Sequence, residues 1–331
     1  MGTVLFADSF HLAENAERRI GSMASIVRLE FGERDAFLAA SRDADIIIAE
    51  YARVDEEILS RAGHLKGIVV YGVGVNHIDL DGAAKRGIPV ANSRGGNAQA
   101  VAELAVSLML ECFRHVGRAD RFVRSGQWES ADSAALPVWM NGRELKGKTL
   151  GVIGPGAIGG IVASIGEAFG MIPVVTSGRS GKHPKYPWIP LEELLARSDV
   201  VSVNVPLLPE SRGLLSRERL SLMKRRAVLV VTSRGGIVDE AAVAEMLASG
   251  DLAGAGFDVF RDEPLSAESP LMRAPNVVLT PHMGGSTEEA VENISGIVAS
   301  CGETLLRGGV PETVVNGELR RSHGYAGRNR A

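Results

Sequence analysis

Short apolar runs alternate with amphipathic segments along almost the whole chain. The runs are rich in Val, Ile and Ala, and most are followed by apolar residues at helical spacing. This alternation is typical of βα units whose parallel strands are buried on both faces of a sheet. The pattern therefore predicts an α/β protein. In the first part of the chain the predicted strands are Thr3–Ala7, Asp45–Ala49, Gly67–Tyr71 and Pro89–Asn92.

A long helix is expected from Ala98 to about Arg124, and a second set of strands follows it. Six strands that begin at a glycine motif make a complete Rossmann-type dinucleotide-binding domain. A final helix, from Thr287 to about Leu306, lies outside this set, so we expect it to return to a smaller, flavodoxin-like substrate domain. The second set of predicted strands is Thr149–Ile153, Val174–Thr176, Val200–Val205, Ala227–Thr232, Gly254–Val259 and Val277–Thr280.

The predicted domains are residues 1–99 and 285–331, which form the substrate domain, and residues 100–284, which bind the dinucleotide. A length of 331 residues is enough for two such domains. A cleft between two domains is a common place for an active site, and we expect the site there.

Composition excludes several classes of partner. The net charge of −4, from 36 basic and 40 acidic residues, gives no electrostatic case for binding nucleic acid or an anionic membrane. No apolar run approaches the length of a membrane span. Cys112 and Cys301 lack metal-ligand spacing, so we expect no metal and two buried free thiols, which fit a reducing cytoplasm.

The glycine motif is Gly154-Pro155-Gly156-Ala157-Ile158-Gly159, directly after one predicted strand and before an apolar helix. The first glycine permits a tight turn, the second lets a pyrophosphate approach the backbone, and the third lets helix and strand pack closely. The helix N-terminus offers N–H groups to the phosphates. All five of Gly154, Gly156, Ala157, Ile158 and Gly159 are therefore candidate cofactor-binding residues.

The segment after the second strand of this domain indicates which dinucleotide binds. An NAD site expects a carboxylate there for the ribose hydroxyls, but residues 175–182 contain none. Ser177 and Arg179 stand there instead, and an arginine can hold a 2′-phosphate. The segment predicts a preference for NADP. The alternative is that Arg179 is a surface charge and that both cofactors are accepted.

Three titratable residues follow three later strands of the same domain. Carboxyl ends of strands are where open α/β sheets bind ligands. Hydride transfer to a carbonyl needs a proton donor and a group that holds the substrate. His282 can donate at neutral pH, Glu263 can orient it, and Arg234 can bind a carboxylate.

With these residues the chain resembles the D-isomer-specific 2-hydroxyacid dehydrogenase family, from about Val4 to Asn316. By this resemblance His282 is the acid/base, Glu263 its partner, and Arg234 the ligand of the substrate carboxylate and carbonyl. The motifs that carry the resemblance, besides the glycine motif and these three residues, are Gly72-Val73-Gly74, Gly95-Gly96-Asn97, Val101-Ala102-Glu103 and Glu144-Leu145-Lys146-Gly147-Lys148-Thr149.

The resemblance implies further roles. The backbone N–H groups of Val73 and Gly74 form a second clamp for the substrate carboxylate. Asp258 accepts a hydrogen bond from the nicotinamide carboxamide, and Pro206 borders the cofactor. The family also implies a homodimer formed through the cofactor domains.

The resulting hypothesis is an NADPH-preferring reductase of a small 2-oxo acid, such as glyoxylate or hydroxypyruvate, that makes the D-2-hydroxy acid. One alternative is an NAD-linked phosphoglycerate or glycerate dehydrogenase, against which stand the missing carboxylate and the early end of the chain. Another is a corepressor-like dinucleotide sensor that binds protein partners. Arg94 is either an extra anion ligand or a surface side chain, and the surface interpretation is slightly favoured. Trp139 is either a core or interface residue or, by the resemblance, part of a neighbouring subunit's substrate pocket.

Overall fold

The computed structural model describes residues 2–128, 137–178 and 183–316. The chain divides into two compact units. Unit 1 consists of Met1–Asn97 and Ser286–Arg330, and unit 2 consists of Ala98–Gly285. Unit 2 is thus inserted between the two segments of unit 1, which agrees with the expectation that the C-terminal helix returns to the first domain.

Unit 1 is built on a parallel five-stranded sheet in the order β2-β1-β3-β4-β5. This is the flavodoxin-like strand order, as predicted. Its strands are β1 (Gly2–Phe6), β2 (Ala24–Arg28), β3 (Ile46–Ala49), β4 (Gly67–Val70) and β5 (Val90–Asn92). Its helices are α1 (Glu14–Gly21), α2 (Arg34–Ala40), α3 (Glu56–Arg61), α4 (Leu80–Lys85) and α11 (Glu288–Leu306).

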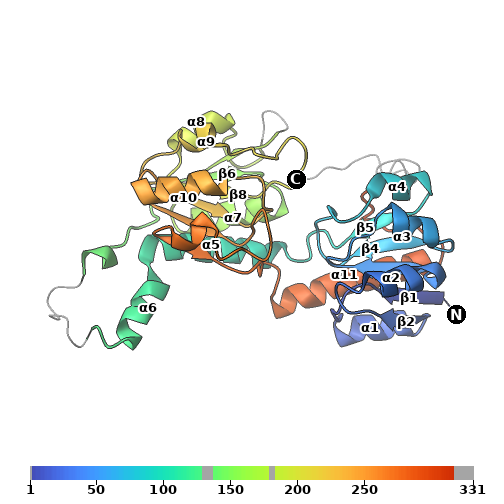
Figure 1. Ribbon diagram of the computed structural model, residues 1–331. Helices are drawn as coiled ribbons and strands as arrows, with labels where there is room; N and C mark the ends of the chain where they lie inside the picture. The colour runs from blue at the N-terminus through green and yellow to red at the C-terminus, as the bar shows by residue number, and fades with distance from the viewer. Residues whose placement is uncertain (1, 129–136, 179–182, 317–331) are drawn as a thin grey trace. The chain divides into compact units, whose positions relative to one another are not determined.

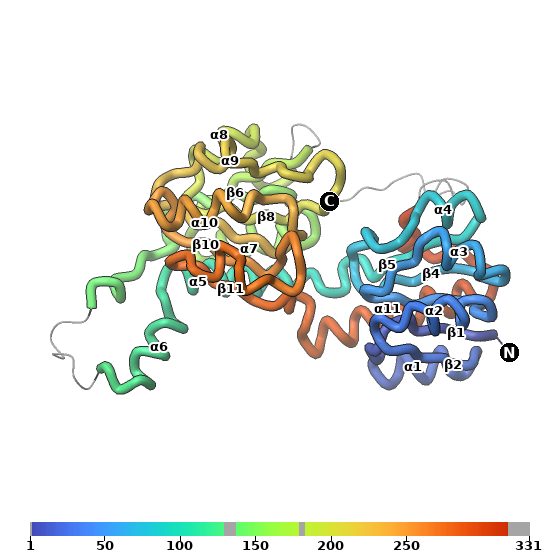
Figure 2. The backbone as a smooth tube through the Cα atoms, in the orientation of Figure 1, coloured from blue at the N-terminus to red at the C-terminus, as the bar shows by residue number. Residues whose placement is uncertain are grey.

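The C-terminal helix α11 packs against the first strands of the chain, as expected. Figure 2 shows this orange segment beside the blue N-terminal elements. Ile294, Val298 and Leu305 of α11 share a buried cluster with Val4 and Ile46. The hydroxyl of Ser295 also accepts a hydrogen bond of 2.9 Å from the N–H of Ala13. Helices α1 and α11 therefore cover one face of the sheet, while α2, α3 and α4 cover the other.

Unit 2 is built on a parallel six-stranded sheet in the order β11-β10-β9-β8-β6-β7. Its strands are β6 (Thr149–Ile153), β7 (Ile172–Thr176), β8 (Val200–Val203), β9 (Val228–Val231), β10 (Gly254–Phe257) and β11 (Val277–Leu279). Its helices are α5 (Ala98–Arg114), α6 (Val116–Arg124), α7 (Ala157–Ala168), α8 (Leu191–Arg197), α9 (Arg217–Leu220) and α10 (Glu240–Ser249), with 3₁₀ turns at Val138–Met140 and Pro270–Arg273.

Strand β6 lies between β7 and β8, so the strand order reverses there. Such a reversal is the usual ligand-binding point of an open α/β sheet. Helices α5 and α7 cover one face, and α8, α9 and α10 cover the other. The predicted α/β class, with a Rossmann-type domain inserted in a smaller one, is confirmed.

Two details differ from the sequence-based expectation. Strand β2 was not expected, because it is an edge strand in which buried and more exposed residues alternate. The helix expected from Ala98 to Arg124 is interrupted at His115, which adopts a left-handed conformation with φ of 53°. After this break α6 buries none of its residues, and it projects from the rest of unit 2 (Figure 1).

Cys112 and Cys301 are buried and free, as predicted. Burial raises the pKa of Cys112 to about 12, so this thiol is uncharged at neutral pH. Within the described ranges, no helix is long and apolar enough to span a membrane.

Candidate active site

The glycine motif forms the turn from β6 to α7. Gly154 has φ of +88°, which a residue with a side chain rarely adopts. A Cβ on Gly159 would lie 2.2 Å from the carbonyl oxygen of Gly154, so helix and turn pack too closely for any side chain. Gly156 caps α7, whose first turn has neither an acidic residue nor a side-chain cap. The N-terminus of α7, with Ala157 and Ile158, can therefore accept an anionic group.

Buried polar atoms at the same edge of the sheet as this turn fit a dinucleotide. The side-chain oxygens of Asn204, Thr232 and Ser233, which follow β8 and β9, are buried and have no hydrogen-bond partner in the part of the chain that the structure describes. Buried polar groups normally have partners, so these atoms point to a polar ligand at the carboxyl edge. Sequence reasoning missed them, because single hydroxyl and amide residues carry no motif.

Ser177 and Pro206, which are expected to help select and border the cofactor, lie on the same edge. Ser177 follows β7 and is partly buried. Arg179 lies outside the described residues. Pro206 follows β8 and is exposed, and its carbonyl accepts a hydrogen bond of 2.6 Å from the hydroxyl of Ser211.

Glu263 and His282 meet at the carboxyl edge of the sheet. They follow β10 and β11, which are neighbouring parallel strands. Nδ1 of His282 lies 2.7 Å from Oε2 of Glu263, and the side chains are 28% and 33% exposed. The other carboxylate oxygen accepts the N–H of Phe260 at 2.8 Å. An ionised carboxylate only accepts hydrogen bonds, so Nδ1 carries a proton and Nε2 can exchange one with a substrate.

The environment of Glu263 keeps it ionised at neutral pH. Burial acts to raise the pKa of Glu263, but the hydrogen bonds from His282 and Phe260 and the positive charges of His282 and Arg234 outweigh it. The pKa of Glu263 therefore lies below the usual 4.5.

This lowered pKa predicts a pH dependence of stability. Because the folded state favours the charged carboxylate, the pair stabilises the protein at pH values above the ordinary Glu pKa. The stabilisation is lost as the pH falls through the lowered pKa. We expect the unfolding free energy of wild type to exceed that of Glu263→Gln by more at about pH 5 than at about pH 3. Urea titrations of both proteins measure this, and a difference independent of pH would contradict it.

His282 sits in a strained turn that Asp258 holds in place. The φ of His282 is 53°, an uncommon value for a residue other than glycine. Asp258 is 1% exposed, and Oδ1 accepts the Thr280 hydroxyl at 2.6 Å and the Met283 N–H at 2.9 Å. Oδ2 accepts the N–H of Gly284 at 2.8 Å. Asp258 thus bonds the chain on both sides of His282, a contact that sequence reasoning did not predict.

Arg234 follows β9, the neighbour of β10. Its guanidinium donates to the carbonyl of Ser233 at 2.7 Å, and its charge acts on Glu263. The next residue fixes this loop: a Cβ on Gly235 would lie 1.8 Å from the carbonyl oxygen of Phe260. The loops that carry Arg234 and Glu263 therefore touch, backbone against backbone. In the sequence, only the glycine pair Gly235-Gly236 indicated such a close backbone contact.

Val73 and Gly74 belong to unit 1, in the loop after β4. The carbonyl of Val73 accepts a hydrogen bond of 2.7 Å from the side chain of Asn92. The hydroxyl of Ser93 accepts a hydrogen bond from the N–H of Gly72 and donates one to the carbonyl of Gly72. Among the described residues, neither the Val73 N–H nor the Gly74 N–H has a hydrogen-bond partner. Val73 is 37% exposed, so these donors lie in an accessible loop.

Known proteins resemble this chain over most of its length. Residues 106–284 match the family model "D-isomer specific 2-hydroxyacid dehydrogenase, NAD binding domain". A glyoxylate reductase from Pyrococcus horikoshii is 39% identical over 292 residues, which cover 86% of this chain and 87% of that one. A D-3-phosphoglycerate dehydrogenase from Mycobacterium bovis is 36% identical over 318 residues, covering 94% of this chain and 58% of that enzyme.

A solved structure is similar in fold. The NADPH-dependent glyoxylate/hydroxypyruvate reductase from Sinorhizobium meliloti, in complex with NADP and malonate, has a TM-score of 0.85 and 28% identity, covering 95% of this chain and 96% of that one. Together with the glycine turn, these similarities show that the chain belongs to the D-isomer-specific 2-hydroxyacid dehydrogenases and is an NAD(P)-dependent oxidoreductase.

Proposed function

We propose that this protein reduces a small 2-oxo acid, such as glyoxylate or hydroxypyruvate, to a D-2-hydroxy acid with a preference for NADPH. The observation that carries the proposal is the hydrogen bond of 2.7 Å between His282 and Glu263, beside the loop of Arg234. The glyoxylate reductase of Pyrococcus horikoshii and the NADPH-dependent reductase of Sinorhizobium meliloti support the substrate class and the cofactor.

In this proposal the bound cofactor supplies a hydride to C2 of the 2-oxo acid. Protonated His282 donates its Nε2 proton to the carbonyl oxygen, and Glu263 stabilises the imidazolium and fixes its ring. Arg234 binds the substrate carboxylate with two parallel N–H groups and polarises the carbonyl. Val73 and Gly74 donate their N–H groups to the same carboxylate. His282 then recovers its proton from solvent, to which its side chain is 28% exposed.

The cofactor would be held by residues on the carboxyl edge of the unit 2 sheet. The N-terminus of α7 binds the pyrophosphate, and the loop at Pro206 borders the dinucleotide. Oδ2 of Asp258 accepts one described hydrogen bond, so it can accept another. In the proposal it would accept one from the nicotinamide carboxamide. The residues proposed for the cofactor are Gly154, Gly156, Ala157, Ile158, Gly159, Ser177, Arg179, Pro206 and Asp258.

A substrate panel tests the proposal. Oxidation of NADPH and of NADH is followed with glyoxylate, hydroxypyruvate, pyruvate and 3-phosphohydroxypyruvate. We expect the highest kcat/KM for glyoxylate or hydroxypyruvate with NADPH. The similarity to a D-3-phosphoglycerate dehydrogenase makes the phosphorylated acid the second candidate. A preference for it, with NADH, would replace the proposal by an NAD-linked phosphoglycerate dehydrogenase.

Arg234→Lys separates binding from chemistry. The variant keeps the charge but loses the planar two-point contact with a carboxylate. We expect KM for the 2-oxo acid to rise about tenfold and kcat to fall, because Arg234 also polarises the carbonyl. Steady-state kinetics measures both constants. An unchanged KM for every 2-oxo acid would remove Arg234 from the site.

The cofactor preference rests on Ser177 and Arg179. If they hold the 2′-phosphate, kcat/KM is higher with NADPH than with NADH. The double variant Ser177→Asp with Arg179→Ala should reverse this order by about tenfold or more, since it adds a carboxylate that repels phosphate and removes a charge-assisted contact. Kinetics with both cofactors decides it, and a wild-type preference for NADH would show that the proposal for this loop is wrong.

We also propose a homodimer formed through unit 2. Helix α6 buries no residue, and apolar side chains on it and near it are exposed. The ring of Trp139 packs on this helix. Its centre lies 6.0 Å from the centre of the Phe122 ring and 4.0 Å from the guanidinium carbon of Arg118. A helix that is left projecting in this way can bury its apolar residues against a second copy (Figure 1). The exposed apolar residues are Val116, Val123, Trp128 and Val138.

A further inference from the structure

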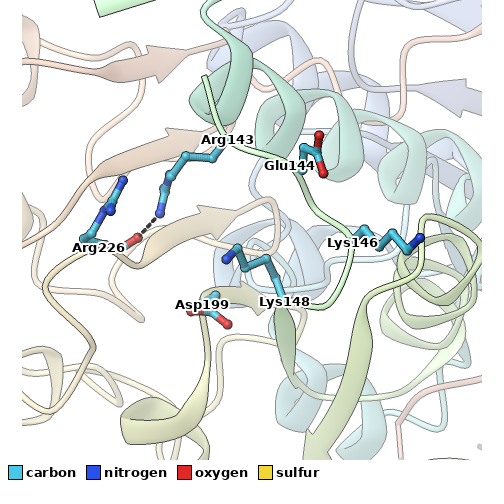
Figure 3. Close-up of a pocket in the computed structure, with 6 residues that line it drawn as sticks. All are labelled: Arg143, Glu144, Lys146, Lys148, Asp199 and Arg226. Carbon is cyan, nitrogen blue, oxygen red and sulfur yellow. Dashed lines mark hydrogen bonds between the residues drawn. The ribbon is translucent and has the colours of Figure 1, made fainter. Parts of the chain in front are cut away.

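A charged cavity lies at the amino edge of the unit 2 sheet, the edge opposite the glycine turn. Lys148 directly precedes β6, Asp199 directly precedes β8, and Arg226 stands just before β9. Because these strands are parallel, their amino ends lie together. The cavity measures about 460 Å³, and we call it the amino-edge cavity (Figure 3). Its lining residues are Arg143, Glu144, Lys146, Lys148, Asp199 and Arg226.

Positive charge dominates this cavity. Four of the six lining side chains are cationic, and none of these four forms a salt bridge within the described parts of the chain. Asp199 is already engaged: it accepts the N–H of Thr149 at 2.9 Å and pairs with Lys224 at 3.1 Å. Glu144 is exposed and has no described ion pair. The lining has no apolar side chain, which excludes a hydrophobic ligand.

Arg143 is held in a fixed position at the cavity wall. Its Nη1 donates to the carbonyl of Arg226 at 2.6 Å, and its guanidinium lies 4.4 Å from the ring centre of Phe113. Burial and the nearby charge of Arg226 lower the pKa of Arg143, while the charge of Asp199 acts in the opposite direction. In Figure 3 the ammonium group of Lys148 points toward these two arginines. Arg143, Lys148 and Arg226 therefore line one cavity in which Asp199 already pairs with Lys224.

We propose that the amino-edge cavity binds a small multivalent anion, bearing phosphate or carboxylate groups, through Arg143, Arg226 and Lys148. Arginine forks and lysine ammonium groups are the side chains that bind such anions best. The volume is large enough for a molecule of the size of pyrophosphate or a tricarboxylate. The site is separate from the proposed chemistry, which lies at the other edge of the sheet.

Calorimetric titration tests this site with inorganic pyrophosphate and with tricarballylate as probes. The protein is first saturated with NADP, so that the phosphate-binding turn at α7 is filled. We expect a Kd below about 1 mM at low salt for at least one probe, and weaker binding at about 0.15 M NaCl because exposed charges are screened. The probe that binds more tightly distinguishes phosphate from carboxylate as the ligand chemistry.

Two neighbouring arginines provide a matched pair of variants. Arg226→Gln removes a cavity cation and should weaken binding about tenfold, the value of one charge-assisted contact. It leaves the backbone carbonyl that holds Arg143 in place. Arg225→Gln makes the same charge change one residue away, where the guanidinium faces Asp251 at 3.7 Å, and should leave Kd unchanged. Lys148→Gln serves as a second cavity variant.

The outcomes are distinct. Weaker binding by Arg226→Gln and Lys148→Gln, with an unchanged Kd for Arg225→Gln, supports the amino-edge site. No binding by wild type, or equal weakening by Arg225→Gln and Arg226→Gln, overturns it. Any anion that binds at Arg234 contributes equally to all these proteins and does not alter the comparison.

Discussion

Replacing His282 by Asn is expected to lower kcat by about 10²–10⁴-fold, the usual contribution of a positioned proton donor. The Asn side chain resembles in size the part of the His side chain that lies closest to the backbone. Asn also tolerates the left-handed conformation with φ of 53° that this position requires. The turn held by Asp258 should therefore persist. Glu263 would lose its partner at 2.7 Å but keep the N–H of Phe260.

The binding of NADPH should change little in this variant, because no proposed cofactor contact involves His282. Fluorescence titration with NADPH measures binding, and single-turnover kinetics measures the chemical step. His64→Asn is the control, since His64 is exposed in unit 1 and away from any proposed role. A His282→Asn protein with turnover close to wild type would refute the assignment of the proton donor.

Gly235→Ala is expected to have the second largest effect, although Gly235 carries no functional group. Its Cβ would lie 1.8 Å from the oxygen and 2.0 Å from the carbon of the Phe260 carbonyl, and backbone atoms cannot move aside as a flexible side chain can. The loop of Arg234 must shift away from the loop of Glu263. A displacement of about 1 Å in a reacting group can cost about 10²-fold in rate, so we expect kcat to fall by about that factor.

The same substitution should lower the unfolding free energy by at least about 2 kcal/mol. Gly160→Ala is the matched control, because a Cβ at this position in α7 meets no atom within 4 Å. That variant should be unchanged or slightly more stable, since alanine favours a helix more than glycine does. Urea unfolding and steady-state kinetics of both variants provide the comparison. Equal behaviour of the two alanine variants would show that the contact between the loops does not position Arg234.

Much of the fold could be predicted from the sequence because buried parallel strands appear as continuous apolar runs. Ile46, Ile47 and Ile48 of β3, for example, are all fully buried. Strand β2 escaped prediction because an edge strand buries fewer of its residues, so its run is broken by exposed positions. The end of α5 at His115 could not be predicted either, since the turn depends on the carboxylate of Glu111, which accepts the N–H of Gly117 at 3.0 Å.

The candidate site was partly predictable for a similar reason. Strand order brings the ends of β9, β10 and β11 together, so Arg234, Glu263 and His282 could be grouped before their distances were known. The contacts that support them were not visible in the sequence. Asp258 bonds residues 22–26 positions away, and Gly235 touches Phe260 across two loops. Such contacts depend on tertiary structure and leave no local pattern.

The stereochemistry of the product tests the central claim most directly. Hydroxypyruvate and NADPH are incubated with the protein, and the glycerate formed is resolved by chiral chromatography. The proposed function predicts D-glycerate, formed in proportion to the NADPH consumed and formed at least about 10²-fold more slowly by His282→Asn. L-glycerate, or no glycerate while the folded protein binds NADPH, would contradict the proposed function.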